Sequence, residues 1–254
     1  PNPLLSHVRE AAALCRAEAA VCVGALALMG DFGTALVFFV CFLVISFMRS
    51  GSFATLFLAI GGAALAVMLV LTVKPYVAQR FATWGHAWED PLNTGFQQVR
   101  TMSATAAGGL FGRGAGAGWL KNIFAANTDM VFGVVCEELG LIVALCCVLS
   151  LLLLAVFSVR SAAAGRSSYY VIASCATLTI FMAQLALNVF GSLDLLPFTG
   201  VTFPFVSKGG SSLISCWGML AYIKAGDTRS GGSFALRTSF ENARRGKKKK
   251  EAVK

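Results

Sequence analysis

The sequence is short of charge. Only 13% of its 254 residues are Asp, Glu, Lys or Arg, whereas a soluble globular domain carries about 25%. At the same time 57% of the residues are hydrophobic, and 20 residues are Phe. Such a chain has too few polar groups to cover the surface of an ordinary soluble domain. The composition therefore indicates an integral membrane protein.

Patterns typical of metal sites and disulfide frameworks are also missing. The chain has eight Cys and two His, but no CxxC or Cys/His spacing that is typical of a metal site. Six of the Cys fall within apolar runs, at Cys22, Cys41, Cys146, Cys147, Cys175 and Cys216. We interpret the cysteines as small hydrophobic residues and predict no metal-ligand set.

The end of the chain is basic. The last eleven residues, RRGKKKKEAVK, contain seven of the 21 Lys and Arg residues. No aromatic residues are interleaved with them, so nucleic acid is not expected as a partner. Two interpretations stay open: a solvated, disordered cytoplasmic tail, or a tail attracted to anionic membrane lipids.

Apolar runs predict an all-α membrane protein. A membrane-spanning helix needs roughly 20 apolar residues. Five segments meet this length approximately, and a sixth is shorter. The short segment is 17–30, and the others are 32–48, 53–73, 130–158, 169–190 and 210–225. The sequence therefore predicts about six transmembrane helices, of which 130–158 is long enough to tilt or project beyond the bilayer.

Lys and Arg in the short connections predict the orientation. Cations follow or precede the predicted spans at Arg9, Arg16, Arg49, Arg160, Arg166, Lys224 and Arg229. The positive-inside rule places these ends in the cytoplasm. The predicted organisation is three spans within 1–73, a large extracellular loop over 74–129, three more spans within 130–226 with an extracellular loop at 191–209, and a cytoplasmic tail over 227–254.

The large loop holds carboxylates and cations together. Glu89 and Asp90 stand side by side between Trp88 and Pro91. The loop also carries five cations, at Lys74, Arg80, Arg100, Arg113 and Lys121. Cations are usually sparse on the outer side of a membrane, although long loops are exempt from this rule. The cations predict either an anionic extracellular ligand or simple ion pairing with Glu89, Asp90 and Asp129.

A glycine-rich stretch, GGLFGRGAGAG, covers residues 108–118. It lacks the GK[ST] ending of a phosphate loop and does not follow a strand, so a dinucleotide site is not expected. Its backbone N–H groups could still face an anion, with Arg113 among them. The alternative is a flexible re-entrant or interfacial turn.

Polar residues interrupt two of the predicted spans. Glu137 and Glu138 fall within the span 130–158, where carboxylates are costly and usually face the bundle interior or a cavity. Gln184 and Asn188 lie four apart, on one face of the span 169–190. We predict that at least one of Glu137 and Glu138 lines a polar cavity, with helix-to-helix hydrogen bonding as the alternative. For Gln184 and Asn188 interhelical hydrogen bonding is the preferred role, and lining the cavity is the alternative.

The segment LPFTGVTFPFVSKGGSSLIS, residues 196–215, contains two prolines and three glycines and cannot be one continuous helix. Lys208, Ser211 and Ser212 offer a cation and hydroxyls for a ligand, whereas Ser211 or Ser212 could instead cap the last helix. Asp31, in MGDFGTALVFF, is predicted to cap the helix that begins after it.

Four blocks resemble the SEDS family, the RodA/FtsW/SpoVE group. They are GDFGTALV (30–37), WEDPLNTGFQQVRTMSATAAGGLFGRGAGAG (88–118), NTDMVFGVVCEELGLI (127–142) and LPFTGVTFPFVSKGGSSLIS (196–215). The resemblance implies a bundle of about ten spans, of which this chain would supply the C-terminal six. It also implies a peptidoglycan glycosyltransferase that polymerises lipid II into a glycan strand beside a class B penicillin-binding protein.

The resemblance implies a site as well. It points to an Asp before Pro in the large extracellular loop as the catalytic residue, which selects Asp90 over Glu89. As a general base, Asp90 would take a proton from the acceptor hydroxyl. The candidates for stabilising the pyrophosphate leaving group are Arg80, Arg100, Arg113, Lys121 and Lys208, and the three arginines are preferred because Arg binds phosphate bidentately. A divalent cation could share this role, but no cofactor is identified.

Two other classes of function stay open. A lipid II flippase would also place polar groups within spans, but it needs charged groups along a path through both leaflets. A non-catalytic scaffold of the division or elongation machinery would not need Asp90. The candidate residues gather toward the extracellular face, which favours an enzyme with an external active site.

Overall fold

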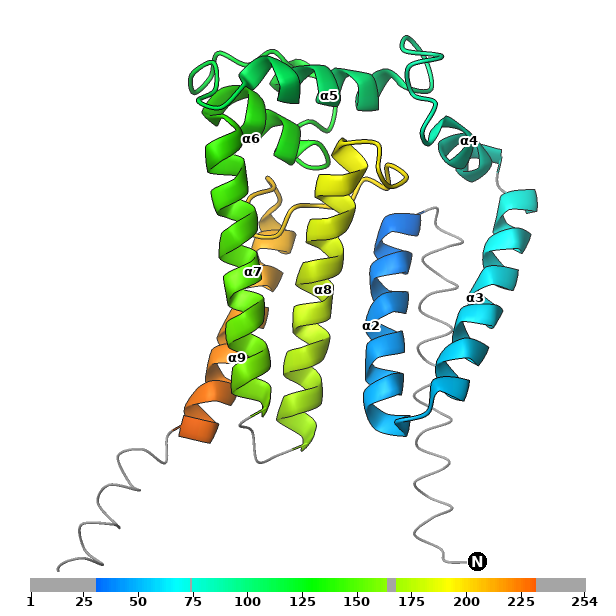
Figure 1. The fold of residues 1–254 in the computed structure, drawn as a ribbon, viewed down its shortest axis with the longest axis vertical. Helices are drawn as coiled ribbons and strands as arrows, with labels where there is room; N and C mark the ends of the chain where they lie inside the picture. The colour runs from blue at the N-terminus through cyan, green and yellow to red at the C-terminus, as the bar shows by residue number, and fades with distance from the viewer. Residues whose placement is uncertain (1–30, 74, 164–167, 232–254) are drawn as a thin grey trace, which may run out of the picture.

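The computed structural model describes residues 31–73, 75–163 and 168–231, and over these residues it contains helices and loops but no strand. The predicted first span (17–30), Lys74 and the basic tail from residue 232 lie outside the described residues. The helices, labelled as in Figure 1, are α2 (Phe32–Ser50), α3 (Phe53–Val73), α4 (Pro75–Thr83), α5 (Phe96–Gly108), the 3-10 helix η1 (Leu120–Asn122), α6 (Val131–Leu139), α7 (Leu141–Ala163), α8 (Ser168–Ser192) and α9 (Gly210–Gly231).

The helices form two layers. Five long helices, α2, α3, α7, α8 and α9, run along the molecule, and the short helices α4, α5 and α6 lie across one end of it (Figure 1). We call this end the cap, meaning residues 75–140 together with the loop 193–209. Helix α8 packs against α2, α7 and α9, and α3 packs against α2 and α4. The cap is therefore carried by a bundle with α8 at its centre.

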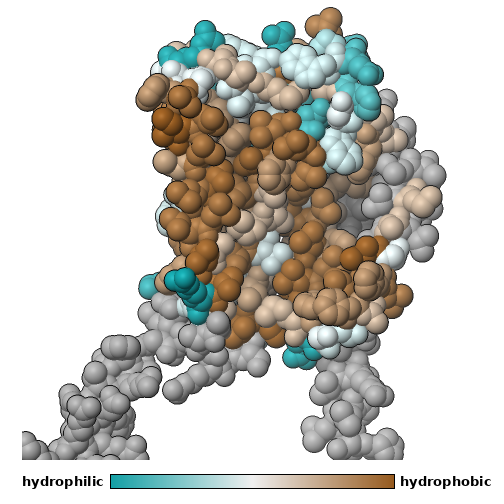
Figure 2. Space-filling view, viewed as in Figure 1, coloured by the Kyte–Doolittle hydropathy of each residue, from teal (hydrophilic) through white to brown (hydrophobic). Residues whose placement is uncertain are grey.

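Three of the helices in the described part of the chain are long and apolar enough to cross a membrane. They are Phe32–Ser50, Leu141–Ala162 and Tyr169–Ser192. Figure 2 shows a hydrophobic belt over the long helices, with hydrophilic residues at both of its ends. Helices α3 and α9 cover the predicted third and sixth ranges. The structure thus shows an all-helical protein with apolar spans, and the count of six spans stays a prediction.

The prediction of one long span over 130–158 is wrong. The chain breaks at Gly140 into the short helix α6 and the candidate span α7. Gly140 has φ 90° and ψ 165°, which is strained for any residue with a side chain. A Cβ atom at Gly140 would also lie 2.3 Å from the carbonyl oxygen of Leu110. Glu137 and Glu138 consequently belong to the cap and not to a membrane span.

The prediction that Asp31 forms the N-cap of the helix that follows it is confirmed. The Asp31 side chain accepts a hydrogen bond from the backbone N–H of Thr34 at 3.0 Å, and α2 begins at Phe32. At the other end, Gly51 adopts the left-handed conformation and its N–H bonds to the carbonyl of Phe47. Asp31 therefore fixes where α2 begins.

Removing this helix cap should lower stability modestly. We expect Asp31→Ala in the full-length protein to reduce the free energy of unfolding by about 0.5–2 kcal/mol, because one N-terminal N–H of α2 loses its acceptor. Asp31→Asn is the matched control and should retain most of the stability. Thermal unfolding of the purified protein measures both, and an equal loss for Ala and Asn would contradict a capping role.

Candidate functional site

The Asp90 carboxylate is held by its own turn. Its Oδ1 atom accepts from the Asn93 side chain at 3.0 Å. Its Oδ2 atom accepts from the Thr94 backbone N–H at 3.3 Å and from the Thr94 hydroxyl at 3.2 Å. These hydrogen bonds, that from the Thr94 backbone first, lower the pKa of Asp90. The turn thus stabilises the charged form of Asp90 and makes it a weaker base.

A second carboxylate in the cap, Asp129, has its pKa shifted in the other direction. Asp129 lies half-buried in the turn that leads into α6, where the N–H groups of Thr128 and Asp129 both bond to the carbonyl of Ala125. Burial raises the pKa of Asp129, and the negative charge of Asp31 raises it further. A hydrogen bond from Thr128 and the positive charge of Arg80 oppose this rise. Asp129 is therefore a stronger base than an ordinary Asp.

Segments distant in sequence fix the Asp129 turn in place. The Ser207 hydroxyl donates to the carbonyl of Thr128 at 2.6 Å, and the Lys208 N–H donates to the carbonyl of Asn127 at 2.8 Å. The Asn188 side-chain amide donates to the carbonyls of Asp129 and Val201, at 3.0 and 2.7 Å. The predicted residue Asn188 thus connects α8 to two loops. Lys208 contributes its backbone here, and its side chain is exposed.

The loop at residues 197–201 brings a cation to the same place. Arg80 Nη1, from α4, donates to the carbonyl of Phe198 at 3.1 Å. Gly200, with φ 73°, packs so closely on Asp129 that a Cβ atom there would lie 3.1 Å from Oδ2. We call this arrangement of Asp31, Arg80, Asp129 and the loop 197–201 the Asp129 junction. It combines one half-buried carboxylate, one guanidinium and a second carboxylate at the start of α2.

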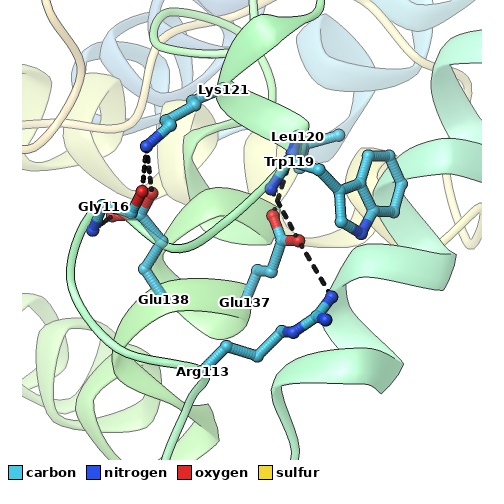
Figure 3. A network of polar contacts seen from close by, with 7 residues as sticks. All are labelled: Arg113, Gly116, Trp119, Leu120, Lys121, Glu137 and Glu138. Atoms are coloured by element: carbon cyan, nitrogen blue, oxygen red, sulfur yellow. Dashed lines mark hydrogen bonds and ion pairs between the residues drawn. The ribbon is translucent and has the colours of Figure 1, made fainter.

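Two further cations of the loop, Arg113 and Lys121, bind the glutamates of α6 (Figure 3). Arg113 Nη1 lies 3.8 Å from Glu137 Oε1, and Lys121 Nζ lies 3.8 Å from Glu138 Oε1. Lys121 Nζ also donates to the carbonyl of Gly116. The ion-pairing alternative therefore describes Arg113 and Lys121, but their partners are the α6 glutamates and not the loop carboxylates that the sequence suggested.

Glu137 is the anchor of this network. Its side chain is 0% exposed, and its two oxygens accept the backbone N–H groups of Trp119 and Leu120, each at 3.0 Å. Glu138 accepts the N–H of Gly116 at 2.9 Å. Figure 3 shows both carboxylates directed at the strip of loop 113–121. The sequence predicts that at least one of Glu137 and Glu138 lines a polar cavity. In the structure their side chains instead hold the loop 113–121 against α6.

The glycine-rich loop closes the break between α6 and α7. The N–H groups of Arg113 and Gly114 bond to the carbonyls of Glu137 and Glu138, at 2.9 and 3.0 Å. In return, the N–H of Leu141 bonds to the carbonyl of Gly109 at 3.0 Å. The N–H groups of residues 113, 114 and 116 are thus occupied within the chain. These three N–H groups are therefore already bonded, that of Gly116 to a carboxylate of the chain itself, and an external anion at the rest of the stretch stays a prediction.

The remaining predicted residues lie around these centres. Arg100 on α5 is exposed, with its guanidinium 5.3 Å from the centre of the Phe96 ring and 5.7 Å from that of Trp119.

Ser211 and Ser212 lie in the first turn of α9, which begins at Gly210, so neither precedes the helix as an N-cap residue would. The Gln184 side-chain oxygen is buried without a hydrogen-bond partner among the described residues.

The described residues contain no group of three or more His, Cys, Asp and Glu side chains that could hold a metal ion. Asp129 is a residue of the junction that the sequence suggests only as an ion-pair partner. The available signal was the polar run NTD directly before the apolar start of α6. The burial of Asp129 and its proximity to Arg80 depend on the loop 197–201, which is about 70 residues away in the chain, and no local pattern shows this.

Comparisons with known proteins agree with the motif resemblance. The profile of the FtsW/RodA/SpoVE family, described as cell cycle proteins, matches residues 3–228. The chain is 30% identical over 203 residues to peptidoglycan glycosyltransferase RodA of Mycobacterium tuberculosis, which covers 80% of this chain and 43% of that protein. It is 33% identical over 186 residues to stage V sporulation protein E of Bacillus subtilis, which covers 72% of this chain and 50% of that protein.

A solved structure is similar as well. It is described as "Structural coordination of polymerization and crosslinking by a peptidoglycan synthase complex" and aligns with a TM-score of 0.63 at 27% identity. The alignment covers 82% of this chain and 59% of the other. The chain spans about half the length of the curated relatives it matches. Because the family profile matches most of the chain, the protein belongs to the FtsW/RodA/SpoVE family of cell cycle proteins, the SEDS family that its four motif blocks resemble.

Proposed function

We propose that the full-length protein containing this chain is a peptidoglycan glycosyltransferase that polymerises lipid II into glycan strands. The observation that carries the proposal is the Asp129 junction, in which a half-buried carboxylate packs against Gly200 of the same loop whose Phe198 carbonyl holds the Arg80 guanidinium. Curated relatives of this chain are named peptidoglycan glycosyltransferases. The chemistry of that reaction needs a base for a sugar hydroxyl and positive charge for a pyrophosphate.

In this proposal Asp129 is the general base. The acceptor hydroxyl oxygen bonds to the anomeric carbon of the donor, the bond from that carbon to the pyrophosphate oxygen breaks, and the hydroxyl proton passes to Asp129. A base works best when its pKa is close to the working pH, so a raised pKa favours Asp129. Asp90, whose pKa is lowered, is the less suitable base. The role of Asp90 as the general base stays a prediction, and substitution of Asp90 tests it.

Arg80 is the cation that supports the leaving group in this proposal. Its Nη1 is fixed by the carbonyl of Phe198, which leaves the planar guanidinium oriented at the junction. A preorganised cation stabilises the charge that develops on pyrophosphate. Arg100 is a second candidate, because its side chain is exposed. Among the described residues it contacts two aromatic rings and pairs with no carboxylate. Arg113 and Lys121 are already paired with glutamates.

The setting of the site extends the proposal. The cap lies at the end of the apolar helices opposite to Arg49 and Arg160, which are in the last turns of α2 and α7. We therefore place the cap, with the active site in it, on the extracellular face of the bacterial cytoplasmic membrane. Lipid II and the growing glycan strand are the proposed ligands, and a class B penicillin-binding protein is the proposed partner. The similar solved structure is described as a peptidoglycan synthase complex, which supports a partner of this kind.

The function is tested with the purified full-length protein and lipid II in proteoliposomes. We expect glycan polymers on a gel without any other glycosyltransferase present. Transport of labelled lipid II between leaflets without polymer would instead show a flippase, and the absence of both activities from folded protein would show a scaffold.

The pH dependence of the reaction tests the role of Asp129. The charged groups that act on its carboxyl are Asp31 at the start of α2 and Arg80 on α4, and Thr128 donates a hydrogen bond to it. A general base must be ionised, so the rate should fall as the pH falls through the pKa of Asp129. Asp31→Asn keeps the helix cap but removes a negative charge that raises this pKa. We therefore expect the acid limb of the pH–rate profile to move to lower pH.

The matched control for this profile is Asp90→Asn, which should leave the acid limb where it is. The polymerisation rate at a series of pH values measures both variants. A limb that moves with Asp90→Asn and not with Asp31→Asn would contradict the assignment of Asp129.

A further inference from the structure

Two large apolar side chains project from the tip of the glycine-rich loop. Leu110 is 58% exposed and Phe111 is 83% exposed. They follow directly after α5 and precede Arg113, in a loop whose other end is held by Glu137 and Glu138. Nothing in the ion-pair network of Figure 3 uses these two side chains. Exposed apolar groups on a rigidly held loop indicate a surface that contacts something apolar.

The backbone of this tip is attached to the first turn of α7. The N–H of Leu141 bonds to the carbonyl of Gly109, and the N–H of Ile142 bonds to the carbonyl of Leu110 at 3.3 Å. Gly140 packs closely on the same stretch. Leu110 and Phe111 therefore lie beside the point at which α7 begins.

That point is also where the membrane should begin. The candidate span Leu141–Ala162 has 22 residues, and at about 1.5 Å per residue it measures roughly 33 Å, close to the thickness of roughly 30 Å for a bilayer core. Arg160 lies near the far end of the span, and Glu138 lies just before the near end. The hydrocarbon boundary on the cap side thus falls close to Leu141.

The exposed face of α7 continues into the loop tip. Ile142, Leu145 and Leu149 are exposed along one face of this helix, and Leu145 is 53% exposed. In Figure 2 the hydrophobic surface rises along the left edge, over α7 and α6, as far as the hydrophilic cap. A lipid-facing surface on α7 would therefore adjoin Leu110 and Phe111, whose stretch of backbone is bonded to the first turn of that helix.

We propose that Leu110 and Phe111 insert into the leaflet on the cap side and anchor the glycine-rich loop to the acyl chains of the membrane. Leu and Phe are among the side chains that partition most favourably into the hydrocarbon of a bilayer. The anchor fixes the height of the loop relative to the bilayer, independently of whether the Asp129 junction is catalytic.

The test places a photo-crosslinking phenylalanine analogue, p-benzoylphenylalanine, at position 111 of the full-length protein in phosphatidylglycerol and phosphatidylethanolamine vesicles. After irradiation, mass spectrometry of the protein identifies adducts. We expect phospholipid adducts at position 111 with a yield similar to that at position 145 on the span. A probe at position 110 serves as a second reporter if the variant at 111 does not fold.

Leu92 is the matched control, because it is 75% exposed but lies in the segment between α4 and α5, which projects away from the long helices (Figure 1). Its lipid adducts should be at least about ten-fold fewer. Equal yields at positions 92 and 111, or adducts at 110 and 111 to protein in place of lipid, would overturn the proposal.

Discussion

Replacing Asp129 by Asn is expected to lower the rate of lipid II polymerisation by about 10²–10⁴-fold, which is the contribution that a general base typically makes. The Asn side chain has nearly the same shape but cannot accept the hydroxyl proton. The turn around it should persist, because Ser207, Lys208 and Asn188 hold the backbone of residues 127–129 and not the carboxylate. Gel analysis of glycan products from the purified full-length protein measures the rate.

Asp90→Asn is the matched control for this loss. It removes a carboxylate whose hydrogen bonds within the described part of the chain all come from its own turn, from Asn93 and Thr94. We expect its polymerisation rate to stay within a few-fold of the wild-type rate, and thermal unfolding should show that both variants are folded. If Asp90→Asn lost activity while Asp129→Asn kept it, the motif-based assignment of Asp90 would stand and that of Asp129 would be withdrawn.

Replacing Glu137 by Ala is expected to destabilise the cap severely. The substitution leaves the N–H groups of Trp119 and Leu120 without an acceptor in the interior. Each such loss costs about 1–3 kcal/mol, so the free energy of unfolding should fall by about 2–6 kcal/mol. Loop 113–121 would lose its anchor, and Trp119 would no longer hold its place beside Arg100. Thermal unfolding of the full-length protein in detergent measures the change.

Two milder substitutions make this prediction specific. Glu137→Gln retains one oxygen that can accept either N–H, so it should recover about half of the lost stability. Glu138→Gln should cost less than Glu137→Ala, because Glu138 is partly exposed and accepts only the N–H of Gly116. A Glu137→Ala protein as stable as Glu138→Gln would show that Glu137 is not the anchor of the loop.

The sequence by itself determined the class of the protein. A low share of charged residues and long apolar runs are typical of helices that lie in the hydrocarbon of a membrane. The candidate spans α2, α7 and α8 could therefore be predicted from local composition. The start of α2 at Asp31 could also be predicted from the local sequence. An N-cap needs only a polar side chain that accepts a hydrogen bond from the N–H three residues further on. The four motif blocks identified the family.

Only the tertiary structure decided what the polar residues do. Glu137 and Glu138 look like intramembrane carboxylates when the run 130–158 is taken as one helix, and only the packing of Gly140 on Leu110 shows the break that removes them from the span. Asp90 and Asp129 are both loop carboxylates next to polar neighbours in the sequence. Their pKa values shift in opposite directions, because hydrogen bonds within its own turn lower the pKa of Asp90, whereas partial burial under the loop 197–201 beside Arg80 raises that of Asp129. Burial and long-range contacts set the pKa, and neither is a property of a local stretch of residues.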